Sequence, residues 1–238
     1  MTGTGLGRLC LAGLLLLSVA GCRRASSPAS GEAAKSYFPM VQGARWVYEL
    51  RSEMGTLRVT VIAKGEMPVR GQDGKLFVLD ERNEGPSMGF VQSSPVGYVT
   101  DQGYIARVTS VDYDGTDRVR MLGEDSPTWL MPLDPKPGAR WHQDNKMFTT
   151  PDGTGKQMGW SGEVHPRTAL DVPAGHFEDV VEVHTSWTDP EVTGQDPTIL
   201  YEDYYARGVG LLRSVTRDAN GDPSKTIEMR LLEYQFPD

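Results

Sequence analysis

The chain has 238 residues, with 24 basic and 32 acidic side chains, a formal net charge of −8 at pH 7, and only two cysteines. An acidic chain without a basic stripe among its aromatic residues is a poor match for nucleic acid, so we expect no nucleic-acid partner. A domain of this size can bury a sufficient core without disulfides.

The first residues have the pattern of an export signal. Arg8 is the lone charge ahead of a short apolar run at residues 9–17. That run is shorter than the roughly 20 residues needed to span a bilayer core. Residues 17–22, Leu-Ser-Val-Ala-Gly-Cys, resemble the bacterial lipobox. The resemblance implies that residues 1–21 are removed as a signal peptide and that the Cys22 sulfur is diacylated, with palmitate-type chains; a plain signal peptide or a membrane helix are the alternatives.

The residues after Cys22 indicate where the mature protein is held. Residues 23–35 contain no large apolar side chain, so we expect residues 22–35 to be a lipidated cysteine and a flexible tether. Two or three acyl chains anchor stably, at ~0.8 kcal/mol per buried CH₂. In Gram-negative lipoproteins an Asp directly after the lipidated cysteine commonly retains the protein at the inner membrane. Because Arg23 stands at that position, the resemblance favours the outer membrane, on its periplasmic or surface face.

From residue 36 onward the apolar residues alternate with a period of two. Trp46, Tyr48 and Leu50 alternate with polar neighbours, and residues 57–64 repeat the pattern. Further short strand candidates extend to residue 234, separated by turn sequences, and no 3.6-residue period is sustained. We therefore expect residues 36–238 to form one mainly β domain. Its antiparallel curved sheet would be a half-barrel, a barrel-like sheet or a sandwich with little helix.

One short phrase occurs twice. Residues 39–46, Pro-Met-Val-Gln-Gly-Ala-Arg-Trp, have a counterpart about 95 residues later in residues 135–141, Pro-Lys-Pro-Gly-Ala-Arg-Trp. Each copy predicts a glycine turn followed by a strand that begins with a buried tryptophan. Two similar half-sheets explain the repeat, and so does a generic turn used twice.

Two later phrases complete a resemblance. They are Val-Pro-Ala-Gly-His-Phe at residues 172–177 and Tyr-Tyr-Ala-Arg-Gly-Val-Gly-Leu at residues 204–211. With the Pro…Gly-x-x-Trp phrases, they resemble a broad group of uncharacterised bacterial secreted and lipoprotein β domains, over nearly the whole mature chain. The resemblance implies an extracytoplasmic β-rich domain and brings no catalytic residues. By themselves, the phrases predict bends that bury Phe177 and place Gly208 and Gly210 at positive φ or in close backbone contacts.

A search for catalytic patterns finds none. The Gly-x-Ser-x-Gly pattern of serine hydrolases is absent, and Ser161 lies in a strand pattern with the wrong spacing. His142, His165, His176 and His184 fall in no compact metal-ligand spacing, although His142 and His184 are expected on strands that could converge. We expect no metal, no cofactor and no catalytic residue.

The acidic groups also have simple explanations. The turns that start at Asp112 and Asp218 lack the calcium-loop pattern of glycine and glutamate positions, so hairpin turns explain them better. Glu202 and Asp203 are adjacent on a predicted strand, so they face opposite sides and cannot share a substrate.

The aromatic residues leave two possibilities for the interior. They predict either ordinary core or the lining of an apolar cavity: Trp46, Tyr48, Trp129, Trp141, Trp160, Trp187, Tyr201, Tyr204 and Tyr205. The leading hypothesis is a non-enzymatic envelope lipoprotein that binds or scaffolds envelope proteins or glycan. One alternative is a carrier of a hydrophobic ligand, which requires a large apolar pocket. The other is a hydrolase, which requires a cleft with hydrogen-bonded titratable groups.

Overall fold

The computed structural model describes residues 28–84, 92–108, 111–121, 127–149, 155–188, 197–218 and 225–237. Within these ranges the chain forms fifteen strands and one 3-10 turn, Ala33–Lys35. The strands are β1 (Arg45–Ser52), β2 (Gly55–Pro68), β3 (Lys75–Glu84), β4 (Gln92–Asp101), β5 (Tyr104–Val108), β6 (Val111–Tyr113), β7 (Val119–Met121), β8 (Thr128–Pro132), β9 (Arg140–Thr149), β10 (Gly155–Val164), β11 (Thr168–Val172), β12 (Gly175–Thr188), β13 (Pro197–Ala206), β14 (Gly210–Asp218) and β15 (Ile227–Gln235).

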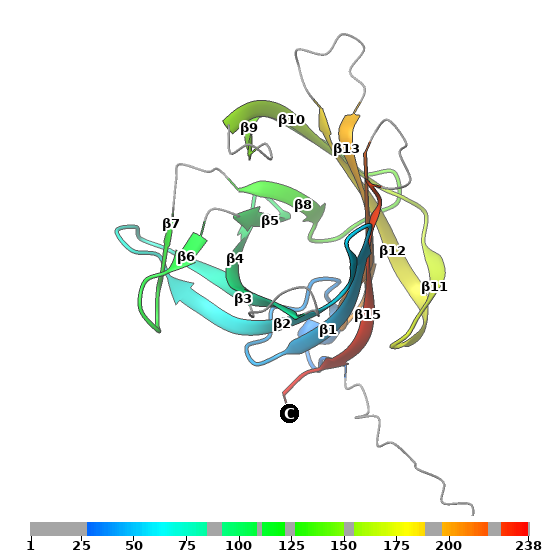
Figure 1. The fold of residues 1–238 in the computed structure, drawn as a ribbon, viewed down its shortest axis with the longest axis horizontal. Coiled ribbons are helices and arrows are strands. Elements are labelled where there is room, and N and C mark those ends of the chain that lie inside the picture. The colour runs from blue at the N-terminus through cyan, green and yellow to red at the C-terminus, as the bar shows by residue number, and fades with distance from the viewer. Residues whose placement is uncertain are drawn as a thin grey trace, which may run out of the picture.

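Thirteen strands form one antiparallel sheet. Twelve of them follow the order β8-β5-β4-β3-β2-β1-β15-β14-β13-β12-β10-β9, and β11 pairs with β12 beside this path. The sheet curls around a central space, with β11 on one side and the β6–β7 hairpin on the other (Figure 1). This confirms the predicted mainly β, antiparallel, barrel-like fold. Curling is the physical solution because each long strand has one apolar face, and closure buries those faces together.

The repeated phrase marks two structurally similar half-sheets. In both copies the turn glycine has positive φ, +85° at Gly43 and +83° at Gly138. The three backbone hydrogen bonds around each turn also correspond: Gly43 N to Ala63 O, Ala44 N to Val41 O and Ala63 N to Ala44 O in the first copy, and Gly138 N to Val164 O, Ala139 N to Lys136 O and Val164 N to Ala139 O in the second. The two copies therefore form the same turn, and each leads into the strand that follows it, β1 or β9.

The strand order extends this correspondence around the barrel. The first half runs β8-β5-β4-β3-β2-β1, and the second runs β15-β14-β13-β12-β10-β9. Strands β1 and β9 are then equivalent, and so are β8 and β15. One junction between the halves is a regular ladder between β1 and β15. At the other junction, β8 and β9 are the two edge strands of the sheet and do not pair with each other. Among the described residues, the hydrogen bonds between them involve side chains.

The end of the expected tether packs against the barrel, which differs from the sequence prediction. The Ala29 N–H donates to the Gly208 carbonyl at 2.9 Å, and Ala29 is buried. Gly208 has a φ of +67°, and a Cβ there would lie 3.2 Å from the Ala34 backbone. The small residues of this segment had suggested a flexible tether, but they allow the segment to pack closely against the barrel instead. The remaining tether, with Cys22, and the signal segment lie outside the described residues.

Other sequence expectations map onto turns and strand ends. The phrase at residues 172–175 joins β11 to β12 as a hairpin, and Phe177 is half-buried near Tyr234. Gly210 has a φ of +95°.

The first acidic turn connects β6 and β7 as a hairpin. The Asp114 N–H donates to the Arg118 carbonyl at 3.0 Å, and the Asp112 carboxylate accepts a hydrogen bond from Arg120 at 2.7 Å. The hairpin interpretation is therefore correct here. The second turn, except for Asp218 at the end of β14, lies outside the described residues.

Candidate functional site

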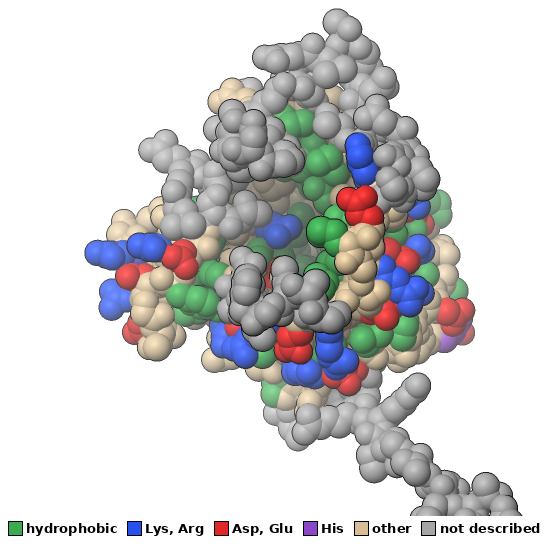
Figure 2. Space-filling model, in the orientation of Figure 1, with side chains coloured by type: hydrophobic (Ala, Val, Ile, Leu, Met, Phe, Trp, Pro, Cys, Tyr) green, Lys and Arg blue, Asp and Glu red, His purple; other side chains and the backbone are tan. Residues whose placement is uncertain are grey.

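The barrel encloses a cavity of about 750 Å³. Figure 2, which looks along the same direction as Figure 1, shows a central hollow with hydrophobic side chains on its walls and a basic side chain at depth. Six of the nine aromatic residues singled out in the sequence line it: Trp46, Tyr48, Trp160, Trp187, Tyr201 and Tyr205. The other three do not, so the aromatic set serves as both cavity wall and core.

One end of the cavity is closed by the segment before β1. Phe38 and Pro39 line the cavity, and the Phe38 ring lies 4.8 Å from that of Tyr98 on β4. Trp46 at the same end donates its indole N–H to the Val209 carbonyl at 2.6 Å. Burial raises the pKa of Tyr98 to about 12.

Arg107 on β5 is the only basic residue among those that line this cavity. It stands opposite Tyr98 on β4 and Thr128 on β8. Its Nε is buried without a hydrogen-bond partner, and no carboxylate of the described residues lies within 4.0 Å of it. Burial lowers the pKa of Arg107, but Tyr98, Glu81, Tyr201 and Asp203 together raise it above its ordinary value, so the guanidinium keeps its charge.

Asp203 faces the cavity from β13, whereas its neighbour Glu202 faces outward and pairs with Arg217. The pair therefore points to opposite sides, as the strand period requires. Burial raises the pKa of the Asp203 carboxyl, although a hydrogen bond from Ser214 and one from Tyr205 oppose this shift. The interior thus penalises the charged form of this carboxyl relative to an exposed aspartate.

The seam between β8 and β9 is closed by side chains. The Trp129 N–H donates to the Gln143 side-chain oxygen at 2.8 Å, and Gln143 donates in turn to the Pro127 carbonyl at 3.2 Å. Lys146 donates to the same Pro127 oxygen at 2.8 Å. The exposed edge of β8 is therefore satisfied by side chains of β9, which protects it from pairing with another chain.

Three polar residues form a hydrogen-bonded chain that sequence spacing did not predict. His142 Nδ1 lies 2.8 Å from Ser161 Oγ, and His142 Nε2 lies 2.7 Å from Asp144 Oδ1. They meet because Ser161 and His142 are directly opposite on β10 and β9. None of the three lines the cavity, and the Asp144 side chain is 78% exposed. For acyl transfer, a serine, a histidine and a carboxylate also require N–H groups that stabilise the oxyanion. The N–H groups of β10 are used in the sheet, because β10 is paired on both sides.

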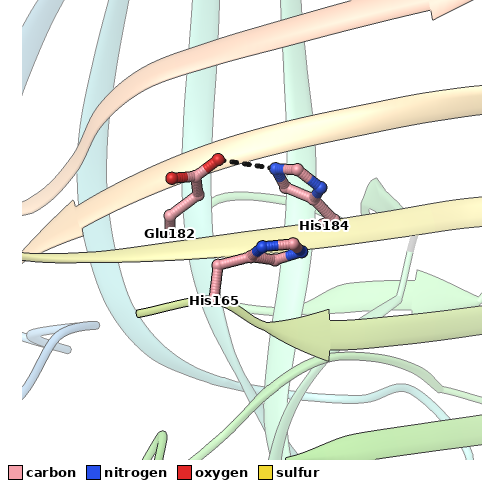
Figure 3. Close-up of side chains that lie close together, drawn as sticks. All are labelled: His165, Glu182 and His184. Atoms are coloured by element: carbon pink, nitrogen blue, oxygen red, sulfur yellow. Dashed lines mark hydrogen bonds and ion pairs between the residues drawn. The ribbon is translucent and has the colours of Figure 1, made fainter. Parts of the chain in front are cut away.

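A second histidine cluster lies near the end of β10, against β12. His165, Glu182 and His184 each offer a ligand atom, and these atoms lie within 4.8 Å of one another (Figure 3). His165 was not expected to join His184, because the two are 19 positions apart in the sequence, with β11 between them. Only the sheet register brings them together. His176, by contrast, is bonded to Asp171 alone among the described residues, at 2.8 Å.

Fold and cavity together define a barrel-like β protein with an internal cavity. No family model and no curated protein matches the chain. A candidate lipoprotein of Parabacteroides distasonis is 14% identical, with a TM-score of 0.44 over 84% of this chain and 98% of its own. A candidate exported protein of Bacteroides fragilis with a YmcC-like fold is 12% identical, with a TM-score of 0.43 over 84% and 99%.

A β-barrel-like protein with a domain of unknown function from Brucella abortus is 8% identical, with a TM-score of 0.38 over 83% of this chain and 99% of its own. Likenesses this distant carry no argument about function, which rests on the chain's own residues. No helix in the described ranges is long and apolar enough to cross a membrane.

Proposed function

We propose that the chain is a lipid-anchored cell-envelope protein whose barrel binds an amphipathic small molecule with an anionic group. The observation that carries this proposal is the internal cavity with Arg107 in its wall. Ligand sites typically have volumes of about 300–1,000 Å³, mostly apolar walls and a few polar groups. A cavity of about 750 Å³ bounded by tryptophan, tyrosine and leucine side chains fits that description.

The charges of the wall favour an acidic ligand group. Arg107 is charged, and its Nε has no hydrogen-bond partner. Because Arg107 lines the cavity, a carboxylate, sulfate or phosphate bound there would accept charge-assisted hydrogen bonds from its guanidinium. Of the two carboxyls in the wall, Asp203 has a pKa that burial raises above its ordinary value. Glu81 forms no ion pair with Arg107 within the described residues, although its charge helps to raise the pKa of Arg107.

The anchor places this cavity near a bilayer. Ala29 is fixed to Gly208 and lies seven positions after the lipidated Cys22, so a span of only seven residue steps joins the barrel surface to the lipid. Seven extended residues reach at most about 25 Å. We assign the protein to the envelope, with the outer membrane favoured by Arg23. A barrel held this close could exchange an amphipathic ligand with the membrane, and this binding role involves no catalytic step.

The test uses the mature chain without lipid. Replacing residues 1–22 by a cleavable secretory signal releases residues 23–238, which include every described residue. Native mass spectrometry is expected to find a co-purifying anionic amphiphile. Tryptophan fluorescence then compares a long-chain fatty acid with the alcohol of the same length. We expect Arg107→Met to weaken fatty-acid binding by roughly tenfold or more, the loss of one charge-assisted bond, and to leave alcohol binding nearly unchanged.

Two further variants make the result specific. Arg217→Met removes an arginine from the outer surface and should change neither affinity. Thr216→Trp places an indole in the cavity wall and should reduce the binding of both ligands. The proposal is wrong if the natural chain binds neither ligand, or if Thr216→Trp leaves the binding intact. Equal loss of acid and alcohol in Arg107→Met would disprove the anionic preference.

A further inference from the structure

We infer that the outer face of the sheet at β12 carries a divalent-metal site made by His165, Glu182 and His184, and that the site selects Zn²⁺. The inference is independent of the cavity, because none of these three side chains lines it.

Two of the three ligands share one face of β12. Glu182 and His184 are two residues apart, so they project to the same side of the strand. His184 Nε2 lies 2.7 Å from Glu182 Oε1. Glu182 and His184 thus form a preformed imidazole–carboxylate pair on a strand that is paired on both sides. The Glu182 side chain is 22% exposed and the His184 side chain is 36% exposed.

The third ligand is brought in by the backbone. His165 directly follows β10, and its N–H donates to the Glu182 carbonyl at 2.8 Å. This bond fixes the His165 side chain beside the pair, and its ring centroid lies 3.8 Å from that of His184. Figure 3 shows the His165 ring against that of His184, with the carboxylate to one side. Coordination needs only side-chain rotations that separate the rings and turn their nitrogens to a common point, and partly exposed side chains can make them.

The donor set selects the metal. Two imidazoles and one carboxylate form a set that binds Zn²⁺ with a fourth position open, at Zn–N distances of about 2.0–2.1 Å. Calcium and magnesium prefer oxygen ligands, so the two nitrogens disfavour them. The copper ion competes best for such a set, and it is therefore the useful comparison in a binding test.

The surroundings stabilise a cation at this point. The Tyr204 hydroxyl donates to the Glu182 carboxylate at 3.3 Å, an outer contact of the kind that orients metal ligands. Glu163 and Glu202 stand directly opposite His184 on the two flanking strands. They are held by Arg140 and Arg217 respectively.

The experiment titrates the lipid-free mature chain, free of any polyhistidine tag, with ZnCl₂ in an isothermal calorimeter. We expect one Zn²⁺ per chain. His165→Ala and His184→Ala should each weaken binding by roughly tenfold or more, since even outer contacts of metal sites are worth 10–100-fold. Glu182→Gln should also weaken it. Binding of Co²⁺ should give the visible absorption of a low-symmetry site, and the same three variants should abolish that absorption.

The chain supplies matched controls. His142 with Asp144 and His176 with Asp171 are also imidazole–carboxylate pairs, but each has only one histidine. His142→Ala and His176→Ala should therefore leave the affinity unchanged. His184→Asn keeps a donor for Glu182, so it separates loss of a ligand from loss of fold, which thermal melting also monitors. The inference fails if no stoichiometric binding occurs, or if His142→Ala or His176→Ala weakens binding as much as His184→Ala.

Discussion

The carbonyl oxygen of Trp129 on β8 accepts the indole N–H of Trp160 on β10 at 2.6 Å, across the seam where the two edges of the sheet meet. The same oxygen accepts the indole N–H of Trp141 at 3.0 Å. At the equivalent junction, β15 and β1 pair through a regular ladder. The two related halves therefore close the barrel in two ways, by backbone at one junction and by tryptophan side chains at the other.

Loss of these indole donors should weaken the seam cooperatively. Trp160→Phe and Trp141→Phe each leave the Trp129 carbonyl with one partner, so each should cost about 0.5–1.5 kcal/mol of unfolding free energy. The double variant leaves the carbonyl without either partner and should exceed the sum by about 1 kcal/mol. Chemical denaturation of the four proteins measures this coupling. Strict additivity would show that the shared carbonyl is not what closes the seam.

Gly162 is required by Trp141 for steric reasons. A Cβ at Gly162 would lie 2.0 Å from Trp141 Cζ2, whereas a Cβ at Gly74 would meet nothing within 4 Å. Gly162→Ala should therefore displace the indole and destabilise the protein by about 1–3 kcal/mol or more. Gly74→Ala is the matched control, and its thermal midpoint should stay close to that of the natural chain. A Gly162→Ala protein as stable as the control would mean that the Trp141 ring moves freely.

Asp203 is expected to cost stability at neutral pH. Burial raises its pKa above the ordinary 3.8, so the unfolded chain releases this proton at lower pH than the folded one does. The loss of unfolding free energy caused by Asp203 is therefore absent below about pH 3.8, and it grows as the pH rises through the folded-state pKa. Asp203→Asn should stabilise the protein at pH 7 and lose that advantage at pH 4, as read from denaturant midpoints. Glu202→Gln, on the outer face, should show no such gain. A destabilised Asp203→Asn protein at pH 7 would contradict this account.

Asp179 should act with the opposite pH dependence on the N-terminal segment. The hydrogen bond from Arg167 lowers the pKa of Asp179, burial opposes the shift, and Arg207 adds to it. The Tyr37 hydroxyl also donates to this carboxylate, and Arg207 donates to the Lys35 carbonyl. The contribution of Asp179 to the free energy of unfolding is present above pH 3.8. It is lost as the pH falls through the lowered folded-state pKa of this carboxyl. For so exposed a group we expect only ~0.2–1 kcal/mol.

The measurement for this network is hydrogen exchange at residues 29–37. Exchange should rise at pH 3 relative to pH 5 after correction for the intrinsic rate, and Asp179→Asn should show the faster exchange at both values. Asp171→Asn, whose exposed carboxylate touches only His176 among the described residues, is the control. Equal protection in the natural chain and in Asp179→Asn would show that the carboxylate does not hold the segment.

Much of this fold can be predicted from the local pattern of the sequence. Alternation at Trp46, Tyr48 and Leu50 predicted an inward face, because strand side chains change sides at every residue. Val-Pro-Ala-Gly and the glycines at positions 208 and 210 predicted turns, because few other residues adopt those backbone angles. Such signals depend only on neighbours along the chain, and the structure confirms them. The export and lipidation signals are equally local, and they remain predictions.

Contacts between distant strands were decided by the tertiary structure alone. Nothing in the sequence indicates that Ser161 faces His142, that His165 lies on His184, or that Arg107 enters an apolar cavity, because each depends on register and on how far the sheet curls. The cavity itself is a property of closure: the same alternating strands, packed as two flat layers, would have filled this space with their own side chains. Sequence alone therefore determined the strands and the turns, whereas the sheet's closure decided that an interior space exists and which residues meet within and around it.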